Sequence, residues 1–122
     1  MTNLTYLRAR NRQFNNDDIA ALAGLTNLQE LNLSTNRISD LSPLSNLTNL
    51  EGLSLVNNQI SDITPLAGLT NLRGLSIFDN QISDLTPLAN LPYLRFLETF
   101  DNPITDWSPV AHIERVHGRP RQ

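Results

Sequence analysis

A gapless internal repeat dominates this sequence and limits what the chain can fold into. Four segments of equal length follow one another directly, at 25–46, 47–68, 69–90 and 91–112. The second and third segments are identical at 16 of 22 positions, and the first and second at 12. Residues 1–24 read as a divergent first copy, slightly longer than the others, and residues 113–122 follow as a C-terminal cap or tail. Such self-similarity is typical of chains that stack one structural unit on the next.

Seven apolar columns recur at fixed places in the repeats. In the third repeat they are Leu69, Leu72, Leu75, Ile77, Ile82, Leu85 and Leu88. Leu75 and Ile77 alternate with polar or small residues, which indicates a short strand with one buried face. The rest of the unit is too short for a long helix and is interrupted by a proline, here Pro87. We therefore expect one coil per repeat, with the stacked coils burying all seven columns in a continuous core.

Two polar columns have structural explanations. One is the asparagine that ends each strand, at Asn36, Asn58, Asn80 and Asn102. We expect it to point inward and to bond backbone groups of its own and adjacent coils. The other is an aspartate just before each proline-containing turn, at Asp40, Asp62, Asp84 and Asp106. We interpret these aspartates as caps of single 3₁₀ turns; calcium binding is the alternative, although no further oxygen ligands stand nearby at loop spacing.

The motif L-x-x-L-x-L-x-x-N-x-I-x-D-L-x-P-L, with Leu-Thr-Asn-Leu at the start of a unit, resembles the leucine-rich-repeat superfamily. The 22-residue period and the D-L-x-P-L turn are similar to its internalin-like bacterial class. This resemblance implies one α/β-type repeat solenoid domain over residues 1–122, wound as a right-handed coil of about five turns. It also implies a short parallel β-sheet on the concave side and 3₁₀ or irregular turns on the convex side. The function that it implies is recognition of a protein partner on the concave strand face.

Composition excludes several classes of site. The chain has no cysteine, so disulfides, thiolate metal sites and cysteine nucleophiles are excluded. The net charge of −3 does not suit nucleic acid or a membrane surface, which require clustered basic charge. The sequence contains no glycine-rich phosphate loop and no serine–histidine pair with an orienting acid, so we expect no enzyme activity and no cofactor or metal.

The start of the chain lacks the basic residues and apolar run of a signal peptide, and no segment is apolar enough to span a membrane. These features fit a cytoplasmic protein or a fragment of a secreted or cell-surface protein. Leu4, Leu7 and Phe14 of the first copy have no polar cap before them. We therefore expect a monomer or at most a weak dimer, and the alternative function is a structural or self-assembling repeat piece.

Function is expected at the outward positions that flank the buried leucines. These positions gather aromatic and apolar residues in the later repeats, with charged residues around them, as partner sites do. The candidate partner-binding residues are Val56, Phe78, Phe96, Phe100, Arg73, Arg95, Glu98 and Asp79. The alternative is that the phenylalanines pack on one another and merely stiffen the sheet. Gly52 and Gly74 could leave a groove for a partner side chain, or could be tolerated where nothing packs.

Two other groups of residues favour structural explanations. Arg8, Arg10 and Arg12 form a basic strip on the first coil, which we interpret as protection of an edge strand rather than as a phosphate site. His112 and His117 lie close in the sequence with Glu114 between them, a poor metal motif, and we expect them in a solvated tail.

Overall fold

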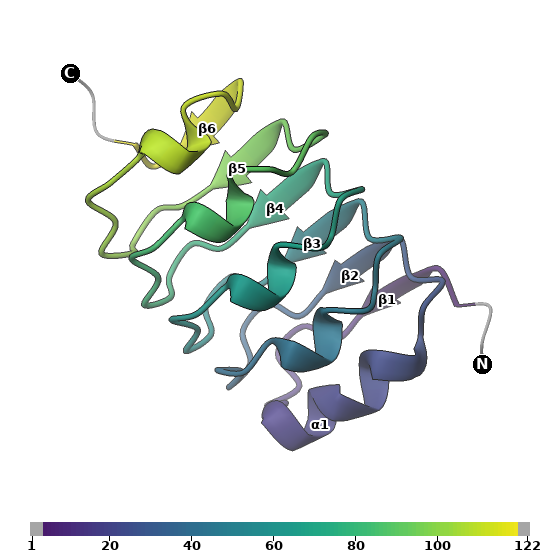
Figure 1. Cartoon of the computed structure of the whole chain (residues 1–122). Helices are drawn as coiled ribbons and strands as arrows, with labels where there is room; N and C mark the ends of the chain where they lie inside the picture. The colour runs from purple at the N-terminus through teal and green to yellow at the C-terminus, as the bar shows by residue number, and fades with distance from the viewer. Residues whose placement is uncertain (1–3, 120–122) are drawn as a thin grey trace.

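Six short parallel strands stack in chain order in the computed structural model, which describes residues 4–119. They are β1 (Tyr6–Arg8), β2 (Glu30–Asn32), β3 (Gly52–Ser54), β4 (Gly74–Ser76), β5 (Phe96–Glu98) and β6 (Arg115–His117). Figure 1 shows the strands side by side on one face of the solenoid, with the helical turns on the other. The leucine-rich-repeat solenoid expected from the sequence is therefore confirmed.

A helical turn lies opposite the sheet in each of the first five coils. The first coil carries α1 (Asn16–Ala20), which continues into the 3₁₀ helix η1 (Ala21–Gly24); the next four carry only 3₁₀ turns, at η2 (Ser42–Leu44), η3 (Thr64–Leu66), η4 (Thr86–Leu88) and η5 (Ser108–Val110). The helix begins at a capping box, in which Asn15 accepts a bond from the backbone nitrogen of Asp18 and the Asp18 carboxylate accepts one from that of Asn15. Its apolar face buries Ile19 completely.

The leucine columns form one core along the whole stack. The middle residues of β2 to β5 are at most 4% exposed, and they are Leu31, Leu53, Leu75 and Leu97. Each lies in register with the middle residue of the next strand, as Leu53 does with Leu75. The core is therefore continuous from coil to coil, and no repeat buries its apolar face alone.

The segment expected as a cap or tail adds a sixth strand to the five coils expected from the repeats. Val116 lies in register with Leu97, and this step along the chain is three residues shorter than the step from Leu75 to Leu97. Ile113, which is 5% exposed, precedes Val116 by the same spacing that separates Leu94 from Leu97. The shorter coil retains the apolar spacing of the strand but loses the opening segment of the repeat.

The β6 strand also explains the polar residue at a core position of the last repeat. Thr99 is 2% exposed, and both its hydroxyl and its backbone nitrogen donate to the carbonyl oxygen of His117 at 2.8 Å. Gly118 follows with a φ of +109°, and a Cβ there would collide with Oγ1 of Thr99. A threonine and a glycine together close this end of the sheet, because a leucine at 99 could not make the hydroxyl bond.

Inward asparagines connect each coil to the one before it, as the sequence predicts. Nδ2 of Asn58 donates to the carbonyl oxygens of Leu33 and Leu55, both at 3.0 Å, and Oδ1 accepts from the backbone nitrogen of Ile38 at 3.1 Å. Leu33 and Ile38 belong to the preceding coil. The same bonds recur around Asn80 and Asn102. One buried side chain thus bonds three backbone groups that the short strands do not pair. The carbonyls of Leu33 and Leu55 also accept from Asn36 and Asn80, so successive asparagines share them.

A second set of asparagines links the coils near the surface. Nδ2 of Asn49 donates to the carbonyl oxygen of Thr26 at 2.9 Å, and Asn71 donates in the same way to Thr48 at 2.8 Å. These residues are the third of the Leu-Thr-Asn-Leu segment. Their recurrence in the sequence is the signal for this second set of bonds between coils.

The residue before each inward asparagine adopts the left-handed conformation. The φ angles are +60° at Thr35, +58° at Asn57, and +60° at both Asp79 and Asp101. Asparagine and aspartate tolerate this conformation, whereas a β-branched residue is strained in it. Thr35 is therefore a strained position in an otherwise regular turn.

Replacing Asn58 by alanine should destabilise the protein by about 1–3 kcal/mol, because the buried backbone nitrogen of Ile38 loses its partner. The carbonyls of Leu33 and Leu55 keep their bonds from Asn36 and Asn80. Equilibrium denaturation by urea measures this difference. Gln59→Ala, at an exposed neighbouring position, is the matched control and should leave the midpoint nearly unchanged. Equal midpoints for the two variants would show that the asparagine bonds are dispensable.

Replacing Thr35 by asparagine should stabilise the protein by about 0.5–1 kcal/mol, because it removes part of the cost of a left-handed β-branched residue. The reverse change one coil later, Asn57→Thr, should destabilise it by a similar amount. Thermal unfolding of both variants beside the wild type measures the pair of shifts. Two shifts of the same sign would contradict the strain at Thr35.

Candidate functional site

The concave face of the sheet carries a hollow of about 420 Å³. Its walls and floor come from the outward positions of the six strands and from the leucine residues between them. The lining residues are Tyr6, Glu30, Leu31, Asn32, Gly52, Leu53, Ser54, Gly74, Leu75, Ser76, Phe96, Glu98 and His117. Two columns of the repeat thus produce the hollow, because the residues on either side of each buried leucine point out of the same face.

The floor of the hollow lies at the two glycines, which differ in what covers them. A Cβ on Gly52 would overlap Oε2 of Glu30, so that carboxylate occupies the space beside this glycine. A Cβ on Gly74 would meet no atom within 4 Å. The groove expected at the glycines is therefore open at Gly74 and filled by a side chain of the protein itself at Gly52.

Hydroxyl groups on and beside the floor form short hydrogen bonds between neighbouring coils. The hydroxyls of Ser34 and Ser54 lie 2.6 Å apart. The hydroxyl of Ser76 donates to Oε1 of Glu98 on the next strand. This bond holds the Glu98 carboxylate beside the floor of the hollow.

Each end of the hollow has an aromatic ring with an arginine over it. Arg8 lies 5.9 Å from the centre of the Tyr6 ring and donates to the Tyr6 hydroxyl at 2.8 Å. At the other end Arg115 lies 5.1 Å from the centre of the Phe96 ring. These distances are typical of cation–π pairs, so Arg8 stabilises a ring of its own strand and Arg115 a ring of the adjacent strand β5. For Arg8 this contact adds a role to the edge protection expected from the sequence.

The structure brings together only part of the predicted binding set. Phe96 and Glu98 line the hollow. Val56, Phe78 and Phe100 do not line it; they form the next outward column, aligned by the bonds from Asn57 to Phe78 and from Asp79 to Phe100 in the continuing ladder. Phe100 is 52% exposed, whereas Val56 and Phe78 are half-buried. We call these three residues the apolar ridge.

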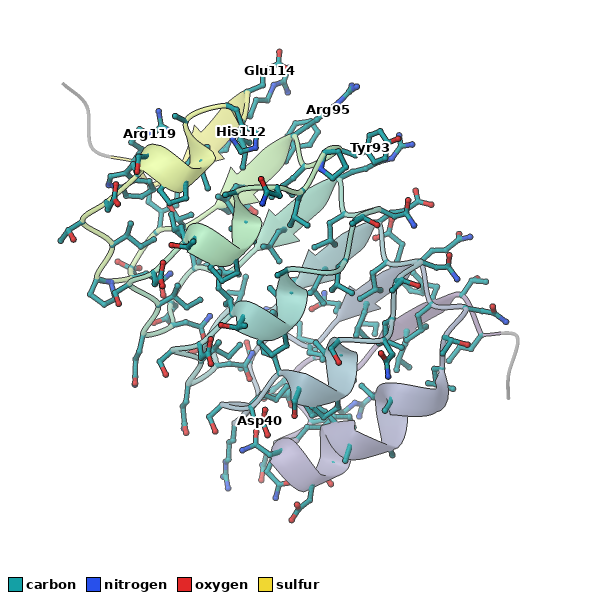
Figure 2. The ribbon with its side chains drawn as sticks, viewed as in Figure 1. Asp40, Tyr93, Arg95, His112, Glu114 and Arg119 are labelled. Carbon is teal, nitrogen blue, oxygen red and sulfur yellow. The ribbon has the colours of Figure 1, made fainter. Side chains whose placement is uncertain are left out.

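The charged members of the predicted set other than Glu98 lie outside the hollow. Nε of Arg73 lies 3.9 Å from Oε1 of Glu51 in the preceding coil, and both side chains are exposed, so this ion pair adds little stability. Arg95 lies near the C-terminal end of the solenoid (Figure 2). Asp79 occupies the left-handed turn position, which gives its identity a backbone explanation independent of binding.

Several lining residues were missing from the predicted set, among them Tyr6, Glu30 and His117. His117 is exposed, as expected, but it lies on β6 in register with Glu98 rather than in an irregular tail. The spacing of Ile113 and Val116 carried the signal for this strand, because it matches the strand entry of the preceding coils.

The aspartate column caps the convex turns, as expected. Oδ1 of Asp62 accepts from the backbone nitrogen of Thr64 at 2.9 Å and from its hydroxyl. The same pair of bonds forms at Asp84 and Asp106, and Asp40 bonds the backbone of Ser42. Each aspartate stands one residue before the N-cap position proper, which an apolar residue occupies. Figure 2 marks Asp40 beside the first helical turns.

These bonds also set the acidity of the aspartates. The hydroxyl and backbone bonds from Thr64 hold the pKa of Asp62 below its ordinary value, and Thr86 does the same for the pKa of Asp84. The neighbouring aspartates oppose the shift of the pKa at Asp84 but do not reverse it. Within residues 4–119 no three histidine, aspartate or glutamate side chains stand close enough to hold a metal ion.

Comparison with protein families identifies the repeat. The family model described as leucine-rich repeats (2 copies) matches residues 2–46, 26–68, 48–90 and 70–112 in overlapping pairs. The comparison with curated proteins found no match. No helix of the described residues is long and apolar enough to cross a membrane.

Three solved structures of bacterial proteins are similar to this chain. Internalin C2 of Listeria monocytogenes is 46% identical with a TM-score of 0.87, over 93% of this chain and 49% of that protein. A second Listeria monocytogenes internalin, InlF, is 41% identical with a TM-score of 0.66, over 77% and 34%. A leucine-rich-repeat protein of Leptospira interrogans is 26% identical with a TM-score of 0.71, over 79% and 26%. The chain thus spans half or less of the length of these proteins.

Acidification should remove the stability that the capping aspartates contribute. Because their folded pKa values lie below the unfolded ones, this contribution is complete above a pH of about 4 and is lost as the pH falls through the lowered values. Denaturation midpoints between neutral and strongly acidic pH measure the loss. Replacing both Asp62 and Asp84 by asparagine keeps an acceptor oxygen at each position and removes the titratable group. This double variant should therefore lose less stability on acidification than the wild type. Parallel curves would contradict the role of these two carboxylates.

Proposed function

Because the chain belongs to the leucine-rich-repeat family, we propose that it is a protein-binding module that recognises its partner on the concave sheet face. Leucine-rich repeats are generally protein-interaction modules, and proteins of this family are typically binding or structural rather than enzymatic. The partner-binding surface in this proposal combines the hollow with the apolar ridge of Val56, Phe78 and Phe100.

The exposure of the aromatic side chains carries the proposal. Phe96 and Phe100 are 45% and 52% exposed on a face whose core leucines are already buried. Aromatic side chains in the centre of an interface commonly provide most of the binding energy, whereas charges at the rim mainly influence the association rate. Six strands spaced about 4.8 Å apart give a face roughly 24 Å long, enough for a helix or loop of another protein.

The charged residues around the ridge are suited to orient a partner. Arg73 and Arg95 are exposed before their strands, and Asp79 is exposed after its strand. Arg73 is 69% exposed despite its contact with Glu51, so a partner carboxylate could replace that weak pair at low cost. In this arrangement Phe78 and Phe100 provide contact area, and the arginines select the orientation.

Self-association through the first coil is the alternative proposal. Leu4, Leu7 and Phe14 pack against the core there but stay only half-buried. A second copy could cover this apolar surface, but arginines such as Arg8 on the first strand oppose tight pairing, so we expect at most a weak dimer. Sedimentation at several concentrations separates the two proposals, since a stable oligomer at micromolar concentration would favour assembly over recognition of a different protein.

Replacing both Phe78 and Phe100 by alanine should leave the fold intact and weaken partner binding by roughly 30-fold or more, corresponding to about 2 kcal/mol. The partner is first captured by the wild type, and its affinity for each variant is then measured by calorimetry. Arg73→Glu should weaken binding less and make it more dependent on salt. Gln81→Ala is the control, because Gln81 is exposed and lies outside the strands, and this variant should bind as the wild type does.

Two results would contradict this prediction. Unfolding of the Phe78 and Phe100 double variant would show that the phenylalanines stiffen the sheet by packing on one another. A folded double variant that binds the partner as tightly as the wild type would place the site on another surface. The melting temperature, recorded beside each affinity, separates these results.

A further inference from the structure

The open part of the hollow is a notch over Gly74, bounded by side chains of the neighbouring strands. The absence of any atom within 4 Å of a Cβ at Gly74 shows that the notch is empty space, and not merely a small residue under a neighbour as at Gly52. The surrounding hollow of about 420 Å³ is large enough for one long side chain of another protein. The remaining question is which side chain it suits.

The charges closest to the notch are negative. Glu98 lies on the adjacent strand, held by the hydroxyl of Ser76, and Glu30 leans over Gly52 toward the floor from the other side. Neither carboxylate forms an ion pair, since the salt bridge found among residues 4–119 joins Arg73 to Glu51. Two carboxylates without a cationic partner therefore face one small space.

Two arginines of this face are already engaged with aromatic rings. Arg8 and Arg115 stand on the two outermost strands, β1 and β6, and each lies over an aromatic ring. Neither lines the hollow. His117 is the basic residue that does line it, and it is in register with Glu98, one strand beyond it. The carboxylates of Glu30 and Glu98 thus line the hollow, whereas no arginine does.

The wall of the notch is apolar on one side. Phe96 is the neighbour of Gly74 in the register of β4 and β5, and its ring is 45% exposed. Lysine and arginine combine an apolar stem with a charged end, so the stem can pack on a ring while the end reaches a carboxylate. An aspartate or glutamate would be repelled here, and an aliphatic side chain would leave both carboxylates without a partner.

We propose that the notch over Gly74 receives a lysine or arginine side chain of the protein partner, with its stem against Phe96 and its charge between Glu30 and Glu98. This inference rests on the proposed protein-binding function and specifies the chemistry of one contact. It assigns different roles to the two glycines, because Gly74 admits the partner's side chain and Gly52 admits the Glu30 carboxylate.

The test uses blocked amino acids as probes of the notch. N-acetyl-arginine amide and N-acetyl-lysine amide are titrated into the isotope-labelled chain, with the norleucine and glutamate analogues as comparisons, and backbone amide shifts are followed by NMR. We expect saturable shifts at Gly74 and Ser76 with the cationic probes. The affinities for these probes should be at least about threefold higher than for norleucine, a difference within the range that an exposed ion pair contributes.

Leucine at Gly74 should fill the notch and abolish these shifts without lowering the melting temperature, because the new side chain enters empty space. Gly68→Leu is the matched control: its Cβ also meets no atom within 4 Å, but it lies on a turn away from the sheet, so probe binding should persist. Glu98→Gln keeps the acceptor for Ser76 and removes the charge, and it should weaken the cationic probes about threefold without affecting norleucine.

Equal binding of all four probes, preference for glutamate, or unchanged shifts in Gly74→Leu would overturn the inference. These outcomes are distinguishable from a failure of the proposed function, because Phe78 and Phe100 do not line the hollow. The double alanine variant at those positions should still bind the arginine probe. Partner binding that depends on the phenylalanines but not on Gly74 would reject the notch alone, and the reverse result would reject the apolar ridge alone.

Discussion

The asparagine at the end of each strand is the interaction on which the rest of this solenoid depends. Such short strands pair few backbone groups, and the chain then turns sharply through a left-handed residue into an irregular segment. Asn58 satisfies one carbonyl of its own coil and two backbone groups of the coil before it. Apolar burial alone would leave these groups unpaired inside the stack, at a cost that the leucine columns would have to offset.

A scaffold stabilised in this way leaves the concave face free to vary. The outward positions of β2 to β5 lie beside leucines that are already buried, so their side chains are not needed for the core. The hollow exists because two successive coils place glycine in one column, while Glu30 and Phe96 stand at either side of them. The convex side varies less, because an aspartate must cap each 3₁₀ turn after the first coil.

Periodicity predicted the repeated coils and failed where the period changes. Leu31, Leu53, Leu75 and Leu97 recur once in every repeat, and their burial followed directly from that regular spacing. The last coil is shorter than the others, so Val116 fell outside the columns and its strand was assigned to a tail. Thr99 stands where the other repeats have leucine or isoleucine, and its hydroxyl bonds the last strand. Local spacing of apolar residues, rather than the overall period, identifies such a strand.

By itself the sequence determined the fold class, the buried columns, the inward asparagines and the capping aspartates, because each depends on a residue type recurring at one place in a coil. It also determined which residues share the outward face, since side chains alternate along a strand. Only the tertiary structure decided that Glu30 fills the space beside Gly52, that Gly74 stays open, and that Phe96 and Phe100 belong to separate surfaces. The physical reason is that alignment of strands fixes the direction in which a side chain leaves the backbone, whereas the space it occupies depends on how neighbouring side chains bend across the sheet.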